Sequence, residues 1–134
     1  MMEKTNRPSL QAALLCEGVT TDAEGRHTIH NEFSQYTMGY SQSFTILTIW
    51  RGNEGTAEYS YNEKTEIVAP DGRVVAEGKN GPFKVADSTY RQVNSILLEN
   101  VDFTNEGVYT FKIALTDATS GMDIVCSSYP IMVI

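Results

Sequence analysis

Apolar and polar residues alternate with a period of two along most of this 134-residue chain. Successive side chains of a strand point to opposite faces, so this alternation is typical of half-buried β-strands. Turn residues interrupt it roughly every eight to twelve positions, the spacing of short strands in an all-β sandwich or barrel. The clearest case is residues 108–116, where one face holds Tyr109, Phe111, Ile113 and Leu115.

The pattern predicts strands over residues 27–36, 44–50, 57–68, 73–77, 91–99, 108–116 and 122–134. A turn is expected at Ala69-Pro70-Asp71-Gly72, because proline presets φ and glycine takes the left-handed position. Residues 78–90 are interpreted as a loop carrying Asn80-Gly81-Pro82. Pro130 predicts an edge or a bulge in the last strand, since proline cannot donate to a central ladder.

The opening segment, residues 8–18, is ambiguous. Helix formers follow Pro8 and end at Gly18, a pattern that favours a helix when it is taken alone. Because a strand follows shortly afterwards, the segment Leu10–Glu17 is equally the first arm of a hairpin. The fold is therefore predicted as an immunoglobulin-like antiparallel β-sandwich of seven or eight strands.

Size and charge limit what the chain does. Its length suffices for one core, so we expect a flexible tail over residues 1–8 and a single β-sandwich domain over residues 9–134. The net charge of −7 repels phosphate backbones and disfavours nucleic acid as a partner. The N-terminus lacks the apolar run of a signal peptide or a membrane span, so we expect a cytoplasmic protein without membrane contact.

Two cysteines, Cys16 and Cys126, lie near opposite ends of the chain. A disulfide between them would close a loop of about 110 residues and contribute roughly 4–5 kcal/mol in the chain-entropy model. The interpretation preferred here is two free, buried thiols that act as small apolar residues in a reducing compartment.

The segment around Tyr109 resembles the approach to strand F in immunoglobulin-like sandwiches. There a tyrosine follows a glycine and bonds through its hydroxyl to backbone a few residues upstream. Here Gly107-Val108-Tyr109 matches that corner, while Phe111 stands where the second cysteine of an antibody domain would be. Trp50 is expected to be the core tryptophan. No cysteine pair brackets Trp50, so antibody-type ancestry is not supported.

A wider resemblance covers most of the chain. Its motifs are Ala12-Ala13-Leu14-Leu15-Cys16-Glu17, Asp22-x-x-Gly25-x-x-x-Ile29, Ala69-Pro70-Asp71-Gly72 and Glu106-Gly107-Val108-Tyr109-Thr110-Phe111. With these the chain is similar to a bacterial domain family of unknown function, whose members are short, stand-alone β-sandwiches. The resemblance implies a strand for the opening segment. It implies no active site, because the shared motifs are turn and core positions.

No residue pattern points to catalysis or to a cofactor. His27 and His30 are three apart on a strand, so their side chains point to opposite faces and cannot share a metal without a bulge. No serine lies in Gly-x-Ser-x-Gly, and both cysteines lie in apolar strands. We therefore expect a protein that is not an enzyme and that binds no cofactor.

Two ends of the sandwich are distinguished by their loops. If neighbouring strands run antiparallel, one end gathers Asp22, Glu24, Glu54, Asp87, Asp117 and Asp123. Clustered carboxylates at such an end bind calcium in other sandwiches, so a calcium- or carbohydrate-binding domain is the alternative function. Ordinary solvated turn residues are the simpler interpretation.

The opposite end gathers residues 36–43, 70–72 and 100–107. The loop Tyr36–Ser43 is uncharged and rich in tyrosine and serine, a composition typical of binding loops. Tyr36, Met38 and Tyr40 are the candidate partner-binding residues, and the alternative is that they cap the end of the core. We thus predict a non-catalytic protein-interaction module that binds an unidentified protein or a second copy of itself.

Overall fold

The computed structural model describes residues 7–32, 35–39, 41–87 and 91–134. Strands account for most of them, and the described residues include no helix. The strands are β1 (Ser9–Thr21), β2 (His27–Glu32), β3 (Gln35–Tyr36), β4 (Ser41–Arg51), β5 (Tyr61–Val68), β6 (Val74–Phe83), β7 (Arg91–Asp102), β8 (Gly107–Asp117) and β9 (Asp123–Val133). No helix long and apolar enough to cross a membrane occurs in these ranges. Of the expected tail, residues 1–6 lie outside them.

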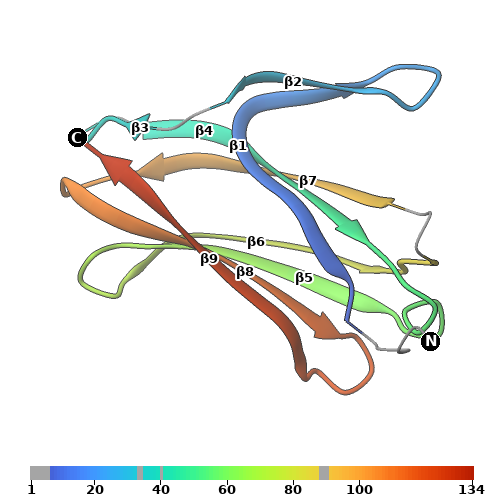
Figure 1. The fold of residues 1–134 in the computed structure, drawn as a ribbon. Coiled ribbons are helices and arrows are strands. Elements are labelled where there is room, and N and C mark those ends of the chain that lie inside the picture. The colour runs from blue at the N-terminus through green and yellow to red at the C-terminus, as the bar shows by residue number, and fades with distance from the viewer. Residues whose placement is uncertain (1–6, 33–34, 40, 88–90) are drawn as a thin grey trace.

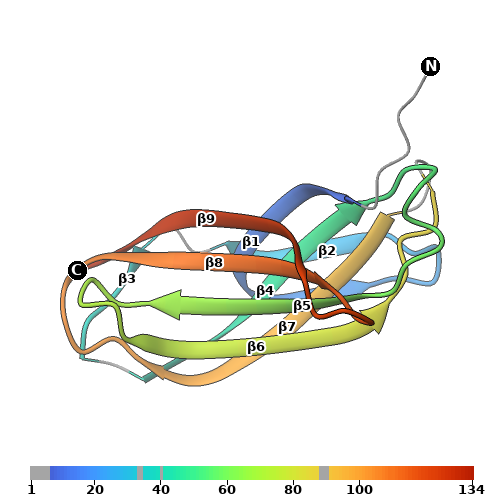
Figure 2. The same ribbon diagram turned by 90° about the horizontal axis from the view of Figure 1, so that it is seen from below.

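The strands form two sheets packed face to face (Figure 1). One sheet has the order β2-β1-β4-β7, and the other has the order β3-β9-β8-β5-β6 (Figure 2). Neighbouring strands run antiparallel, except that β3 and β9 pair in parallel at two positions. The prediction of an immunoglobulin-like antiparallel sandwich is confirmed. Eight longer strands match the larger predicted count, and the two-residue β3 is an addition.

Alternate residues of facing strands build the core between the sheets. On β8 the buried residues are the four expected from the alternation, Tyr109, Phe111, Ile113 and Leu115. The opposite sheet contributes Phe44, Ile46 and Trp50 from β4, and the Trp50 side chain is fully buried. Trp50 is therefore the core tryptophan that the sequence predicts.

The tyrosine corner is present. The Tyr109 hydroxyl donates to the Asn105 carbonyl at 2.8 Å, and the Asn105 amide lies 3.3 Å from the same hydroxyl oxygen. The expected turn before β6 is also found, since the Gly72 amide donates to the Ala69 carbonyl and Gly72 has a φ of 91°. Both features follow from local sequence.

Two predicted boundaries are wrong. Residues 57–60 were expected to begin a strand, but β5 begins at Tyr61, because the Thr56 hydroxyl and Asn53 organise a turn over the preceding residues. Residues 78–90 were expected in a loop, but β6 extends to Phe83 and includes Asn80-Gly81-Pro82. The register between β5 and β6 shifts there. β6 is an edge strand, where a proline removes no ladder bond from a second neighbour.

The ambiguous opening segment is a strand. Its residues pair with β4 from Ser9 opposite Arg51 to Cys16 opposite Thr45. This long-range pairing outweighs the local helix propensity. From Cys16 onward β1 pairs with β2 instead, and the two form a hairpin arm in which every residue from Thr20 to Glu32 is exposed.

The two long edges of the sandwich differ. At one edge β6 and β7 contact each other across the sheets, and we call this the closed edge. A Cβ added to Gly78 of β6 would lie 2.6 Å from Cγ2 of Ile96 on β7, so only glycine permits this approach. At the other edge β2 pairs only with β1 from Cys16 onward, and β3 pairs only with the end of β9. The remaining parts of β1 and β9 face each other there, nearest the viewer in Figure 1, and we call this the open edge.

Candidate functional site

The three predicted partner-binding residues do not form one exposed surface. Tyr36 was expected to be exposed, but it is only 2% exposed, and its ring packs against those of Phe44 and Phe103 at centroid distances of 5.2 and 5.1 Å. Burial raises the pKa of its hydroxyl above the usual value. Met38 is 41% exposed, and Tyr40 lies outside the described residues.

Backbone hydrogen bonds explain why Tyr36 turns inward. The Ile134 amide donates to the Tyr36 carbonyl, the Met38 amide donates to the Ile134 carbonyl, and the Gly39 amide donates to the Phe103 carbonyl. These bonds hold the segment between the chain terminus and the β7–β8 loop. The three predicted segments do gather at one end. The predicted loop Tyr36–Ser43 is shorter than expected, because Tyr36 belongs to β3 and Ser41–Ser43 begin β4, and Tyr36 caps the core there.

The acidic end forms no metal site in the part of the chain that the structure describes, where no three carboxylate, histidine or cysteine side chains group together. The Asp22 carboxylate accepts bonds from the Arg26 amide at 2.9 Å and from the Arg26 Nε at 2.7 Å. These bonds lower the pKa of Asp22, and the bond from the Arg26 amide has the largest effect. The Asp117 carboxylate accepts a hydrogen bond from the Thr119 amide within the same turn. The calcium or carbohydrate alternative is therefore not favoured.

The two histidines occupy opposite faces of the arm, as predicted. Nδ1 of His27 lies 2.9 Å from the Thr21 hydroxyl, and Nε2 of His30 lies 3.1 Å from the Thr20 hydroxyl. Each imidazole is thus part of a cross-strand pair with a threonine of β1.

Both cysteines are free, but only one is buried. Cys16 is fully buried at the bend of β1, and burial raises the pKa of its thiol. Cys126 was expected to be buried and is exposed, because it pairs with Ala114 on the outer face of β8 and β9. The alternation of β9 sends Val125 and Ser127 inward with Leu115 and Ile113 and leaves Cys126 outside.

A hydrogen-bonded carboxyl group lies in the core beside the closed edge. Glu63 of β5 is 1% exposed, and its Oε2 accepts bonds from the Thr48 hydroxyl and the Trp50 indole nitrogen of β4. Asn94 of β7 lies opposite Thr48 and is also buried. The network links the two sheets and is enclosed by them.

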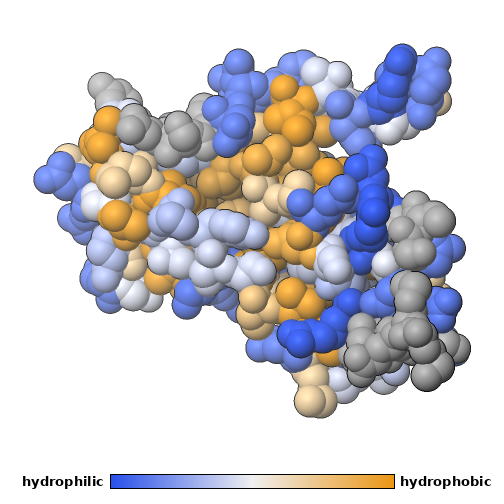
Figure 3. Space-filling model, in the orientation of Figure 1, coloured by the Kyte–Doolittle hydropathy of each residue, from blue (hydrophilic) through white to orange (hydrophobic). Residues whose placement is uncertain are grey.

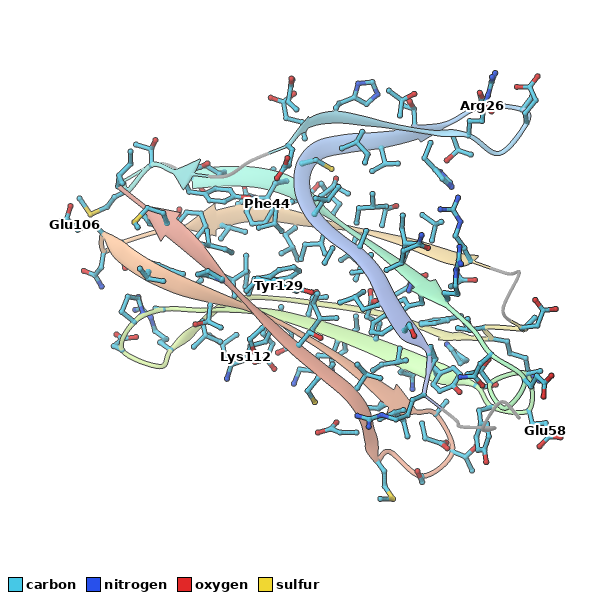
Figure 4. The ribbon with its side chains drawn as sticks, in the orientation of Figure 1. Arg26, Phe44, Glu58, Glu106, Lys112 and Tyr129 are labelled. Atoms are coloured by element: carbon cyan, nitrogen blue, oxygen red, sulfur yellow. The ribbon has the colours of Figure 1, made fainter. Side chains whose placement is uncertain are left out.

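An apolar groove opens between the sheets at the open edge. It has a volume of about 250 Å³. Its apolar lining includes Ala13 and Leu15 of β1, Phe111 of β8, and Tyr129 and Ile131 of β9, and Tyr36 and Glu32 also line it. Figure 3 shows the apolar surface gathered in the middle of this face. Tyr129 is 43% exposed, although its strand position faces the interior, and Figure 4 shows it between the sheets.

The strand edges that flank the groove are uncharged. Residues 8–16 and 124–134 contain no Asp, Glu, Lys or Arg. In the described residues, Ser9–Ala13 of β1 pair only with β4, and residues 125–131 of β9 pair only with β8. Each edge therefore presents backbone donors and acceptors beside an apolar groove.

Sequence reasoning did not identify this groove. The two uncharged runs can be seen in the sequence, and they are the available signal. Nothing local shows that they lie opposite each other across the sandwich, because that depends on the pairing of β1 with β4 and of β9 with β8.

Comparison with known proteins identifies a family but no activity. A family model described as "Family of unknown function (DUF6941)" matches residues 11–122. No curated protein matches the chain.

Two solved structures are similar to this chain. The C-terminal domain of wzt is 12% identical with a TM-score of 0.62, and the match covers 98% of this chain and 76% of that one. The CARDB domain of a Pyrococcus furiosus protein in complex with di-metal ions is 9% identical with a TM-score of 0.49. That match covers 100% of this chain and 95% of the other. The first likeness supports a β-sandwich and nothing finer.

Proposed function

Since this chain belongs to DUF6941, a family of unknown function, we propose its role from its geometry: it is a non-catalytic protein-interaction module. It binds an extended segment of a partner protein at the open edge, between β1 and β9. The observation that carries this proposal is the pair of uncharged, singly paired strand edges on either side of an apolar groove.

The physical basis is strand addition. An extended peptide that lies along an open edge gains main-chain hydrogen bonds, and pockets for its alternate side chains give specificity. Sheet edges usually carry lysine, proline or a bulge that blocks such pairing. Here β9 has Pro130 and β1 has a bulge between Leu10 and Ala12, but neither edge has a charged side chain.

The lining of the groove favours binding over catalysis. Most of its side chains are apolar, and its one carboxylate, Glu32, is exposed. Among the described residues that line it, no nucleophile is paired with a base, which acyl transfer requires. An apolar pocket with few polar groups is typical of recognition sites.

A displayed library of random decapeptides tests the proposal. Peptides are selected on the wild-type protein, and their affinities are compared on Ala13→Lys, which places an ammonium group in the groove. Ala13 lies opposite Thr48, whose side chain is in the core, so position 13 faces the space between the sheets. The matched control is Val74→Lys, at an exposed position of β6.

We expect the selected peptides to bind Ala13→Lys at least about tenfold more weakly, because a single anchor contributes 1–2 kcal/mol or more. Val74→Lys should bind as the wild type does. A second variant, Tyr129→Ala, removes an anchor without adding charge and should also weaken binding. Amide chemical shifts should change at residues 9–13 and 124–131. Selected peptides whose affinities are the same on wild type and Ala13→Lys would overturn the proposal.

A further inference from the structure

Glu32 places a carboxylate at the groove. Glu32 ends β2, pairs with Cys16 of β1, and lines the groove with Tyr36 and Leu15. Its side chain is exposed. Ion pairs join Arg26 to Asp22 and Glu24, Lys64 to Glu66 and Glu77, and Lys79 to Glu77, and within the described residues none of these pairs includes Glu32.

No cation of the flanking strands offsets this carboxylate. Neither β1 nor β9 contains a lysine or an arginine. Glu17 lies one residue beyond Cys16, and its carboxylate accepts a bond from the neutral Asn31 amide. The whole chain has a net charge of −7. The root of the arm therefore presents negative charge at the end of an apolar groove, and complementary charge favours association.

The volume of the groove sets the size of the apolar anchor. About 250 Å³ is available, and an enclosed apolar cavity of roughly 150 Å³ accepts a benzene ring. The space thus fits one aromatic or large aliphatic side chain between Ala13 of β1 and Tyr129 of β9.

We propose that the occupant of the groove is an extended, basic segment of a partner protein, which seats one aromatic or large aliphatic side chain in the groove and pairs a lysine or arginine with Glu32. This inference rests on the proposed function and names the chemistry of the partner. In an extended segment, neighbouring side chains of one face lie about 7 Å apart, so an anchor and a nearby cation can engage the groove together.

A second copy of the chain fits this surface less well. In a two-fold contact the same patch meets itself, so the groove of one copy would face that of the other. Each copy would bring Glu32 and Glu17 to the contact and no lysine or arginine from β1 or β9. Like charges would then oppose the association.

The peptides selected above test this inference. Those that discriminate between wild type and Ala13→Lys are sequenced, and their affinities are measured on Glu32→Gln. Glu99→Gln, at an exposed glutamate of β7 on the closed edge, is the matched control. Thermal melts of both variants check that the fold is retained.

We expect lysine or arginine to be enriched in the groove-binding peptides together with an aromatic or large aliphatic residue. Glu32→Gln should weaken their binding by about twofold to fivefold, as loss of an exposed ion pair does, and this difference should shrink at high salt. Glu99→Gln should leave the affinity unchanged.

Failure of this inference is distinct from failure of the proposed function. Groove-binding peptides without a basic residue, or equal affinities on wild type and Glu32→Gln, would overturn the basic partner and leave the interaction module standing. Equal affinities on wild type and Ala13→Lys would overturn both. A dimer in light scattering that Ala13→Lys dissociates would replace the partner protein with a second copy.

Discussion

The closed edge and the open edge of this sandwich are both formed by β-strands, but they differ in how closely the two sheets approach and in the charge of the side chains along them. At the closed edge the two sheets approach closely, since Gly78 leaves room for Ile96 and Leu98. Charged side chains accompany it, Glu77 and Lys79 on β6 and Arg91, Glu99 and Asp102 on β7. At the open edge, residues 9–13 and 124–131 have no charge and flank a groove.

This difference suggests that the closed edge matters more for stability and the open edge more for binding a partner. Near the closed edge the sheets approach closely, and the enclosed Glu63 carboxyl group of β5 accepts two hydrogen bonds from β4. The open edge leaves apolar surface such as Tyr129 partly exposed, which adds little to folding and remains available to a partner. Substitutions should therefore be costly at the closed edge and mild at the open edge.

The largest effect is expected from Glu63→Ala. Without the carboxylate, the Trp50 indole N–H and the Thr48 hydroxyl are left buried without their acceptor. Stranded buried donors and the lost packing should reduce the free energy of unfolding by about 2–4 kcal/mol. Glu63→Gln keeps a carbonyl acceptor and should cost less. Urea denaturation followed by Trp50 fluorescence measures both, and a neutral Glu63→Ala would mean that the network does not stabilise the core.

Gly78→Ala should have the next largest effect. The new methyl group would lie 2.6 Å from Cγ2 of Ile96 and 3.0 Å from the Thr65 hydroxyl oxygen. Overpacking of this kind should lower the free energy of unfolding by about 1–3 kcal/mol, which urea denaturation measures. The matched control is Gly18→Ala, whose Cβ would meet no atom within 4 Å. If both variants were equally stable, the two sheets would not be as close at this edge as described.

Tyr129→Ala should lower the free energy of unfolding by about 1 kcal/mol or less. A fully buried aromatic costs about 3–5 kcal/mol when truncated to alanine, but Tyr129 is 43% exposed at the groove. Thermal and urea unfolding give this value independently of any partner. A loss above about 2 kcal/mol, well beyond what half-buried side chains cost, would show that the groove is packed and that the open edge is a second closed edge.

The smallest effect on stability is expected at Cys126. Cys126→Ser replaces an exposed thiol and should change the free energy of unfolding by less than about 0.5 kcal/mol. In the wild type, a thiol reagent should modify Cys126 in the folded state. Cys16 should react only through unfolding, because it is fully buried and its raised pKa keeps it protonated. Mass spectrometry of the intact protein distinguishes one adduct from two.

Local sequence patterns determined the fold class and several positions in it. The alternation around Tyr109, the corner formed by its hydroxyl, and the turn at Gly72 depend on neighbouring residues. These features are encoded within a few residues, so one sequence suffices to predict them. The burial of Trp50 was expected from the resemblance to immunoglobulin-like sandwiches.

Only the tertiary structure decided the remaining features. Leu10–Glu17 is a strand because β4 pairs with it, Tyr36 is buried because Ile134 and Phe103 hold its segment, and Cys126 is exposed because of the register with β8. The groove depends on two uncharged runs, residues 8–16 and 124–134, that are more than 100 residues apart in the sequence. A period of two shows that a strand has two faces. For β9, which face meets the core depends on its register with β8, and which edge of the sandwich stays open depends on long-range pairing; no local pattern encodes either.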